Sequence, residues 1–301
     1  MIWTRVLTAL VLMPAAIAIV LFAPTWGVAI AVAVLTVQAL WEYFALGEAI
    51  GHRAYRFWTF FCALLLLVQT WRSTRPFAFL TASVHQSGTV QSTAISAQAA
   101  AIGQRISAIY SPVSLFFLFV MGLTVLTLFT RRPLVETLPS AGISSSALLL
   151  VAFPLSFAVR LDAFKLNGPR LLLFALVVTW AADTVAYFAG RAFGKHPLAP
   201  HISPKKTWEG SIAGVAGSLI VGYVFHYWLT IPVPHLLAMA FVGNVAGQMG
   251  DLLESACKRS AGVKDSGGLL PGHGGILDRI DALILCIPAI WYYLVLVNPA
   301  M

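Results

Sequence analysis

The chain has 301 residues, of which 59% are apolar and only 10% are charged, and its mean hydropathy is +0.85. A soluble domain carries about 25% charged residues, so this composition excludes a soluble protein and predicts a polytopic membrane protein. The net charge of the chain is +8. In a membrane protein, cytoplasmic loops enriched in Lys and Arg account for such an excess, so it requires no nucleic-acid partner.

Apolar runs recur along the whole chain, and a membrane-spanning helix needs roughly 20 such residues. The predicted spans cover residues 3–23, 26–46, 56–71, 113–130, 145–160, 171–190, 210–229, 235–254 and 279–297. The first has a basic residue before an apolar run, as a signal peptide has, but it lacks a convincing cleavage site and we expect it to be retained. We therefore predict an all-α polytopic helical bundle of about nine transmembrane helices, forming a single membrane domain over residues 1–301.

The N-terminal half, residues 1–170, carries only four of the 11 carboxylates and no cluster of them, and it is interpreted as a scaffold. Glu42 lies between Trp41 and Tyr43 near the end of a span, which favours an interfacial residue over a catalytic one. The segment 82–111, rich in Ser, Gln, Ala and Thr, is predicted to be an external loop. The C-terminal half, residues 171–301, carries seven of the 11 carboxylates and is interpreted as the catalytic half.

The distribution of basic residues predicts the orientation in the membrane. If Arg5 is cytoplasmic and the spans alternate, 13 Lys and Arg residues lie inside and 6 lie outside. Such an excess marks the cytoplasmic side. We therefore expect an integral protein of the cytoplasmic membrane, with the charged loops 191–209 and 255–279 facing the cytoplasm.

Asp183 lies inside the apolar run 171–190, where an unpaired carboxylate is costly, so a functional site is favoured over snorkelling to the surface. Tyr187, four residues later, shares its helix face. In the following loop, Ser203 and Pro204 are typical of an N-cap and first helical residue, which would place Lys205 and Lys206 in the first turn of a helix. Free N–H groups and two ammonium groups there favour a phosphate site over an ordinary basic loop.

Residues 250–281 hold five of the 11 carboxylates. Asp251, Ser255 and Lys258 recur at helical spacing and share one face, while Asp278 and Asp281 begin the last span. Two facing helices would therefore direct carboxylates to one point. Mg²⁺ binds one or two carboxylates together with phosphate oxygens and water, so we favour a metal site over an interhelical cluster of salt bridges.

The loop between these two helices is harder to interpret. Lys264 and Asp265 are compatible with a solvated pair or with a phosphate clamp. His273 is surrounded by glycines, including Gly274 and Gly275, which is typical of backbone that closely approaches a ligand.

Together these segments resemble one family. Ser255-x-x-Lys258-Arg259-x4-Lys264-Asp265 followed by His273-Gly274-Gly275-x-x-Asp278-Arg279-x-Asp281 closely resembles the signature of phosphatidate cytidylyltransferases. The segments from Asp183 to Arg191 and from Ser203 to Gly210 are also similar to that family. The resemblance covers roughly residues 180–285.

The resemblance implies transfer of a cytidylyl group from CTP to phosphatidate, giving CDP-diacylglycerol and pyrophosphate, by a dimeric membrane enzyme that depends on a divalent cation. Mg²⁺ is the expected cation, with Mn²⁺ as an alternative and room for a second ion. The implied metal ligands are Asp251, Asp278 and Asp281. The expected catalytic residues are Asp183, Lys258, Arg259, Asp278 and Asp281. The expected phosphate-binding residues are Ser203, Lys205, Lys206, Thr207, Ser255, Lys264, Asp265, His273, Gly274, Gly275 and Arg279.

Two other functions are kept as alternatives. A CTP-dependent lipid-alcohol kinase, acting on a polyprenol or phytol, would transfer the γ-phosphoryl group and release CDP. An ion-coupled transporter would use the same carboxylates to bind its coupling ion, but the charges here concentrate at loops and span ends on one side, with a basic excess suited to phosphate.

Overall fold

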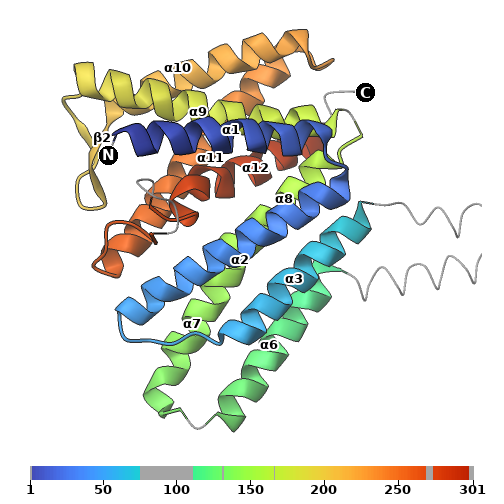
Figure 1. Cartoon of the computed structure of the whole chain (residues 1–301), viewed down its shortest axis with the longest axis vertical. Coiled ribbons are helices and arrows are strands. Elements are labelled where there is room, and N and C mark those ends of the chain that lie inside the picture. The colour runs from blue at the N-terminus through green and yellow to red at the C-terminus, as the bar shows by residue number, and fades with distance from the viewer. Residues whose placement is uncertain (1, 75–110, 131, 166, 269–273, 298–301) are drawn as a thin grey trace, which may run out of the picture.

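The structure, a computed structural model, describes residues 2–74, 111–130, 132–165, 167–268 and 274–297, and it confirms a polytopic all-α membrane fold (Figure 1). Within these residues, seven helical segments are long and apolar enough to cross a membrane. They are Thr25–Ala49, Pro112–Phe129, Leu134–Asp162, Gly168–Phe193, Trp208–Tyr227, Val233–Ser260 and Leu277–Val297. His273 and residues 82–110 of the predicted external loop lie outside the described residues.

The predicted count of nine spans is not confirmed, although each predicted span coincides with a helix. For helix α1 (Ile2–Phe22), the apolar segment within the residues whose side chains are described is Leu10–Phe22. Helix α3 (Arg56–Ser73) begins and ends with charged and polar side chains, and Gln69 interrupts its apolar run, so its hydropathy is lower. In the described part of the chain, seven helical segments therefore meet the length and hydropathy of a span, and α1 and α3 are further helices beside them.

The N-terminal half forms one side of the bundle. After α1, its remaining helices are α2 (Thr25–Ala49), α3, α6 (Pro112–Phe129), the 3₁₀ turn η1 (Leu134–Glu136), α7 (Thr137–Ala147), the π-helical turn η2 (Leu148–Ala152) and α8 (Phe153–Asp162). The predicted span 145–160 is thus part of a longer continuous helical segment. Its polar N-terminal part is accommodated because Ser144 donates its hydroxyl to the Ser140 carbonyl 2.8 Å away within the helix.

The C-terminal half forms the other side of the bundle, in the upper part of Figure 1. Its elements are α9 (Gly168–Phe193), β1 (Pro197–Ala199), β2 (Ser203–Thr207), α10 (Trp208–Val224), the 3₁₀ turn η3 (Phe225–Tyr227), α11 (Val233–Ser260) and α12 (Leu277–Val297). Helix α9 packs along α10, and α11 packs along α12. Helix α11 continues six residues beyond the predicted span 235–254, and this extension carries Lys258.

The two halves meet at α8, which contacts α2, α3, α9 and α12. Phe157 on α8, Phe174 on α9 and Ile290 on α12 are almost completely buried in this shared core. Dispersion and close packing hold such helices together, because lipid is as apolar as the side chains and burial from lipid gives little hydrophobic gain.

The loop after α9 differs from the predicted helix start at Ser203. Residues 203–207 form strand β2, which pairs antiparallel with β1, and the N-cap of the next helix is Thr207, whose hydroxyl accepts a hydrogen bond from the Gly210 N–H at 3.2 Å. The prediction was wrong because the strand pairing satisfies the backbone of 203–207 before a helix can begin. Lys205 and Lys206 therefore lie on a strand, outside the first turn of α10.

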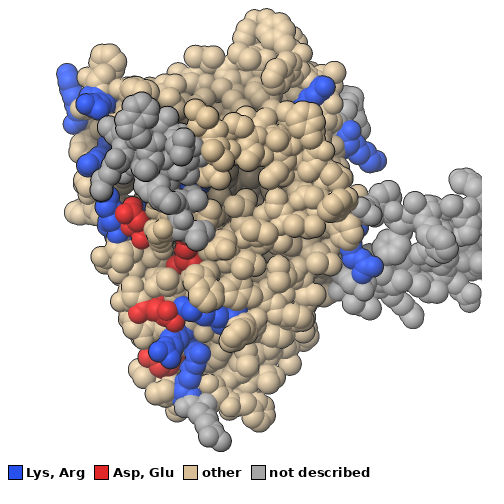
Figure 2. Space-filling view, viewed as in Figure 1, with Lys and Arg blue, Asp and Glu red and all other residues tan. Residues whose placement is uncertain are grey.

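Charged side chains lie at the margins of the molecule, most of them at one margin (Figure 2). On the face shown in Figure 2, the acidic residues and most basic residues lie toward the left edge, and the broad central surface is formed by other residues. The β1–β2 hairpin and the C-terminal end of α11 lie on the same side in Figure 1. An uncharged band between charged margins is the surface that a bilayer requires.

Candidate functional site

A groove of about 630 Å³ lies between the hairpin and the ends of α9, α10 and α11. Its lining includes basic side chains from β2 and α9 and carboxylates from α9 and α11. The charged lining residues are Asp183, Arg191, Lys205, Lys206 and Asp251. Three cations and two anions in one open groove suit a ligand that carries several negative charges.

The ion pairs of the groove cross between elements. Lys206 on β2 forms an ion pair with Asp251 on α11. Asp183 on α9 interacts electrostatically with Asp251, Lys206 and Arg279. The structure thus brings together Asp183 and Asp251, which are 68 positions apart in the sequence.

Glycines allow the hairpin to lie directly on the end of α9. A Cβ atom at Gly194 would lie 2.7 Å from the Thr207 methyl group, and one at Gly210 would lie 2.8 Å from the Ala186 carbonyl oxygen. A side chain at Gly194 would push β2 away from α9, and one at Gly210 would push the start of α10 away from α9. Thr207 therefore shapes the site from the strand end and caps α10.

Close contact between α11 and α12 places a further carboxylate beside the groove. A Cβ atom at Gly250 would lie only 2.5 Å from the backbone oxygen of Asp281. Gly243 and Gly247 on the same helix face also contact α12, an arrangement of small residues that permits close helix packing. As a result, Asp281 interacts electrostatically with Asp251, Asp183 and Glu254.

A second group of charges centres on Lys258. Its Nζ lies 2.5 Å from Glu254 Oε2 on the same helix and 2.6 Å from Asp278 Oδ1 on α12. The other oxygen of Asp278 accepts hydrogen bonds from the N–H groups of Gly275 at 2.8 Å and Ser266 at 3.0 Å. This is the interhelical salt-bridge arrangement that the sequence left as an alternative, and it occupies Asp278 with protein donors.

Glu42 joins this cluster from α2, in the other half of the chain. Its carboxylate accepts hydrogen bonds from the N–H groups of Ile276 at 2.8 Å and Leu277 at 2.9 Å, and from the Ser266 hydroxyl at 2.8 Å. Ser266 Oγ is also 3.0 Å from Asp278, and its single proton serves one carboxylate at a time. Glu42 is buried, so the prediction of an interfacial residue was wrong.

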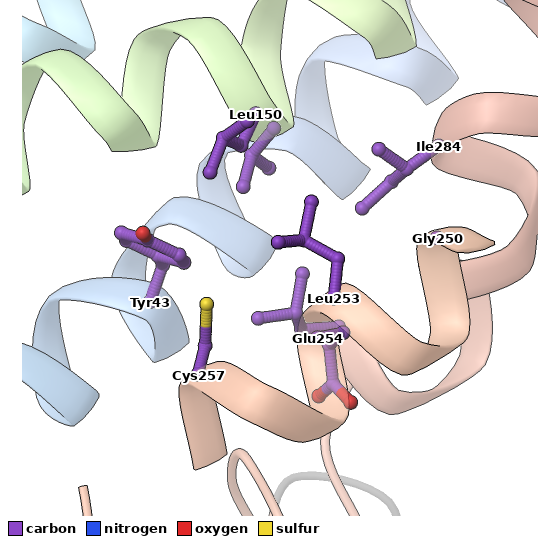
Figure 3. A pocket seen from close by; sticks show the side chains of 9 residues that line it. Tyr43, Leu150, Gly250, Leu253, Glu254, Cys257 and Ile284 are labelled. Carbon is purple, nitrogen blue, oxygen red and sulfur yellow. The ribbon is translucent and has the colours of Figure 1, made fainter. Parts of the chain in front are cut away.

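A small cavity behind the Lys258 cluster is a packing feature. Its volume is about 20 Å³, enough for one water molecule, and its walls are mostly apolar. Figure 3 shows the Glu254 carboxylate pointing away from Leu150 and Tyr43. Glu254 therefore directs its charge toward Lys258, and the cavity is too small for a substrate.

The remaining predicted residues divide between the site and its surroundings. The Ser255 hydroxyl is 3.4 Å from Asp251 Oδ1. Arg259 donates to the backbone oxygens of Ile202 and Val263, which ties the hairpin to the end of α11. Lys264 and Asp265 are exposed. Ser203 pairs with Ala199 in the hairpin, and Gly274 has a φ of 79°, which favours glycine.

Among the described residues, no three His, Cys, Asp or Glu side chains lie close enough to hold a metal ion by themselves. The chemistry of the donors nevertheless fits Mg²⁺, which takes one or two carboxylates and completes its shell with substrate phosphates and water. Asp183, Asp251 and Asp281 come from three helices and interact electrostatically. Asp278, with its oxygens engaged by Lys258, Ser266 and Gly275, is the least suited of the predicted ligands.

Sequence reasoning missed four contributors to the site and its surroundings, namely Glu42, Ser211, Gln248 and Ser266. Glu42 had a detectable signal, because an ionisable residue within an apolar helix is by default a functional candidate. The Ser211 hydroxyl hydrogen-bonds to Gln248, and both residues line the groove. Nothing in the sequence distinguishes Ser266, Ser211 or Gln248 from other polar residues.

Comparison with known proteins agrees with this geometry. The model of the cytidylyltransferase family matches residues 3–297. The chain is 38% identical over 177 residues to the phosphatidate cytidylyltransferase of Bacillus subtilis, covering 57% of this chain and 66% of the relative.

Two further relatives carry the same name. The phosphatidate cytidylyltransferase of Haemophilus influenzae is 47% identical over 133 residues, 42% of this chain and 46% of the relative. That of Staphylococcus haemolyticus is 44% identical over 146 residues, 48% of this chain and 54% of the relative. The matched region spans about half to two thirds of the length of these relatives. Because the family model covers nearly the whole sequence, the chain belongs to the cytidylyltransferase family.

Proposed function

We propose that this protein transfers a cytidylyl group from CTP to phosphatidate, producing CDP-diacylglycerol and pyrophosphate in phospholipid biosynthesis. The observation that carries the proposal is the groove in which Lys205, Lys206 and Arg191 face Asp183 and Asp251. Family membership and the names of three relatives support the same reaction.

The reaction joins two anions, and the groove supplies charges that offset their repulsion. An oxygen of the lipid phosphate attacks the α-phosphorus of CTP and forms a new P–O bond. The bond from that phosphorus to the oxygen bridging to the β-phosphate breaks, and pyrophosphate leaves with the electron pair. The lipid phosphate is already an anion, so no protein nucleophile is required.

The side chains of the chain position the reactants and stabilise charge. Lys206 exchanges its contact with Asp251 for a triphosphate oxygen, and Lys205 and Arg191 neutralise the departing pyrophosphate. Preorganised cations of this kind contribute most of the rate when charge develops in a site shielded from water. Lys258 acts indirectly, by holding Asp278 and the loop before α12 in place.

Mg²⁺ is part of the proposal, with Asp251 and Asp281 as its ligands and Asp183 beside them. When bound, it would screen the phosphates and orient the triphosphate. We further propose that the enzyme lies in the cytoplasmic membrane, that its groove opens to cytoplasmic CTP, and that it acts as a homodimer. Size measurement in nanodiscs tests the dimer separately from activity.

The experiment is an assay of purified protein with CTP, phosphatidate and Mg²⁺, in which both pyrophosphate and CDP are measured. We expect pyrophosphate and CDP-diacylglycerol in equal amounts. Release of CDP with a phosphorylated lipid alcohol would instead identify the kinase alternative. Solute uptake by proteoliposomes without nucleotide would favour the transporter.

The matched variants are Lys206→Gln and Lys195→Gln. Both remove one positive charge from the same connection, but only Lys206 lines the groove. Loss of a charge-assisted hydrogen bond to phosphate costs about 1.5–3 kcal/mol, so Lys206→Gln should lower kcat/KM about 10- to 100-fold. The kcat/KM of Lys195→Gln should stay close to that of the parent protein. Equal rates for all three proteins would contradict the assignment of the groove.

A further inference from the structure

A second basic cavity, of about 450 Å³, lies between the α2–α3 loop, α3 and the end of α6. It shares no lining residue with the groove described above. Figure 1 places α3 and α6 in the lower half of the molecule, away from α9 and α10. Its lining contains three guanidinium groups, of Arg53, Arg56 and Arg132, against one carboxylate, Glu48.

Arg132 is held in a fixed orientation. Its guanidinium lies 4.8 Å from the centre of the Tyr55 ring, a cation–π arrangement. Its NH1 group donates to the Arg53 carbonyl at 2.5 Å and to the Ser140 hydroxyl at 3.2 Å. Arg132 follows α6, whereas Arg53 lies in the loop before α3, so two separate connections direct their cations to one cavity.

Arg56 is also preorganised. It pairs with Glu48 at 2.7 Å, and its guanidinium lies 5.2 Å from the Trp41 ring centre and 5.8 Å from that of Phe44. Glu48 offsets only one of the three positive charges lining the cavity. The cavity therefore has an excess of positive charge. The planar guanidinium groups match the geometry of a phosphate, which arginine binds through two parallel hydrogen bonds.

The surroundings of the cavity are apolar and exposed. Phe57, on the cavity wall, is 93% exposed, and Leu134, two residues after Arg132, is 88% exposed. Trp58 and Leu126 complete the apolar part of the lining. In a membrane protein such side chains face acyl chains, so a ligand here meets cations at one end and hydrocarbon at the other.

We propose that this cavity binds the phosphate group of an anionic phospholipid, at a site separate from the groove. Arg53 and Arg132 bind the phosphate, and Arg56 adds positive charge. The acyl chains lie against Phe57 and the neighbouring apolar surface. Basic pockets between spans on the cytoplasmic side suit anionic headgroups, which concentrate in that leaflet.

The test uses native mass spectrometry of the detergent-solubilised full chain titrated with phosphatidylglycerol, with zwitterionic phosphatidylcholine as the reference lipid. We expect the parent protein to retain phosphatidylglycerol preferentially. Arg53→Gln should weaken this retention about tenfold. Arg132→Lys keeps the charge but loses the planar fork, and should weaken it by a smaller factor.

Arg170→Gln is the matched control, because Arg170 is an exposed arginine that lines neither cavity. Thermal midpoints are measured for each variant, so that a folding defect is recognised. Unchanged retention in both Arg53→Gln and Arg132→Lys would overturn the proposal. Displacement of the lipid by millimolar inorganic phosphate would overturn the lipid assignment and identify a free phosphate as the ligand. The measurement needs neither CTP nor turnover, so its outcome is independent of the proposed reaction.

Discussion

At the residue scale, the carboxylates of the site have different tasks although they look alike in the sequence. Asp278 accepts hydrogen bonds from two backbone N–H groups and pairs with Lys258. Asp251 faces the groove, where its partner is a lysine that a phosphate can replace. Asp278 therefore organises the loop before α12, and Asp251 faces the substrate.

This difference predicts opposite phenotypes for two conservative substitutions. Asp278→Asn replaces one acceptor oxygen by an amide donor, which then faces either Lys258 or the N–H groups of Ser266 and Gly275, so we expect a destabilisation of about 1–3 kcal/mol. Asp251→Asn should leave the thermal midpoint nearly unchanged and reduce kcat at least 100-fold. Thermal unfolding in detergent and pyrophosphate release are measured on both variants. A stable Asp278→Asn protein with normal turnover would show that the cluster is dispensable.

Glu42 gives a second prediction at this scale. In Glu42→Gln the amide nitrogen faces backbone N–H groups that need an acceptor, so at least one of the three hydrogen bonds is lost. We expect a loss of about 2–3 kcal/mol in stability and lower turnover, since the same loop holds Asp278.

The control for that experiment is Glu48→Gln, on the same helix. Its pair with Arg56 is partly exposed, and such pairs contribute at most about 1 kcal/mol. Equal thermal midpoints for the two variants would contradict the role of Glu42 in holding the loop.

At the scale of elements, the contact between α11 and α12 sets the spacing of the carboxylates. Gly250 allows the helices to approach so closely that a Cβ atom there would lie 2.5 Å from the Asp281 backbone oxygen. A methyl group there has no space, because its neighbour is main chain and cannot rotate away. The helix pair must then separate, which moves Asp281 away from Asp251.

We therefore expect Gly250→Ala to destabilise the protein by about 1–3 kcal/mol. We also expect turnover to fall by more than the loss of folded protein accounts for, because Asp281 has moved away from Asp251. Gly142→Ala provides the matched change on α7, where a Cβ atom meets nothing within 4 Å. That variant should be neutral or slightly more stable, because alanine favours helix. Thermal midpoints and turnover at saturating CTP check both expectations, and similar behaviour of the two variants would contradict the packing argument.

At the scale of the whole molecule, the two halves are not independent. The N-terminal half contributes Glu42 to the loop before α12, across 235 residues of sequence. It also builds the second basic cavity. The predicted division into a scaffold half and a catalytic half remains a prediction, and the position of Glu42 shows that the N-terminal half supports the site directly.

The orientation of the protein in the membrane is testable at this scale with cysteines that are introduced one at a time. His201, exposed in the hairpin connection, and Lys165, exposed before α9, lie on opposite sides in the predicted topology. In intact cells of a host with a single membrane, a membrane-impermeant maleimide should label Lys165→Cys and spare His201→Cys, and inverted vesicles should show the reverse. The parent protein, whose Cys62 and Cys286 are buried and whose Cys257 is partly exposed, provides the labelling background. Labelling of His201→Cys from outside would place the groove away from cytoplasmic nucleotides.

The sequence by itself determined the class of fold, and it singled out most of the charged residues that line the groove. The physical reason is that hydrocarbon tolerates few charges, so both the spans and the exceptional carboxylates stand out without any coordinates. The tertiary structure alone decided which carboxylate faces which partner, that Lys205 and Lys206 lie on a strand, and that Glu42 belongs to the loop before α12. These outcomes depend on strand pairing, on glycine contacts between helices and on hydrogen bonds between distant segments, and spacing along one chain does not encode such contacts.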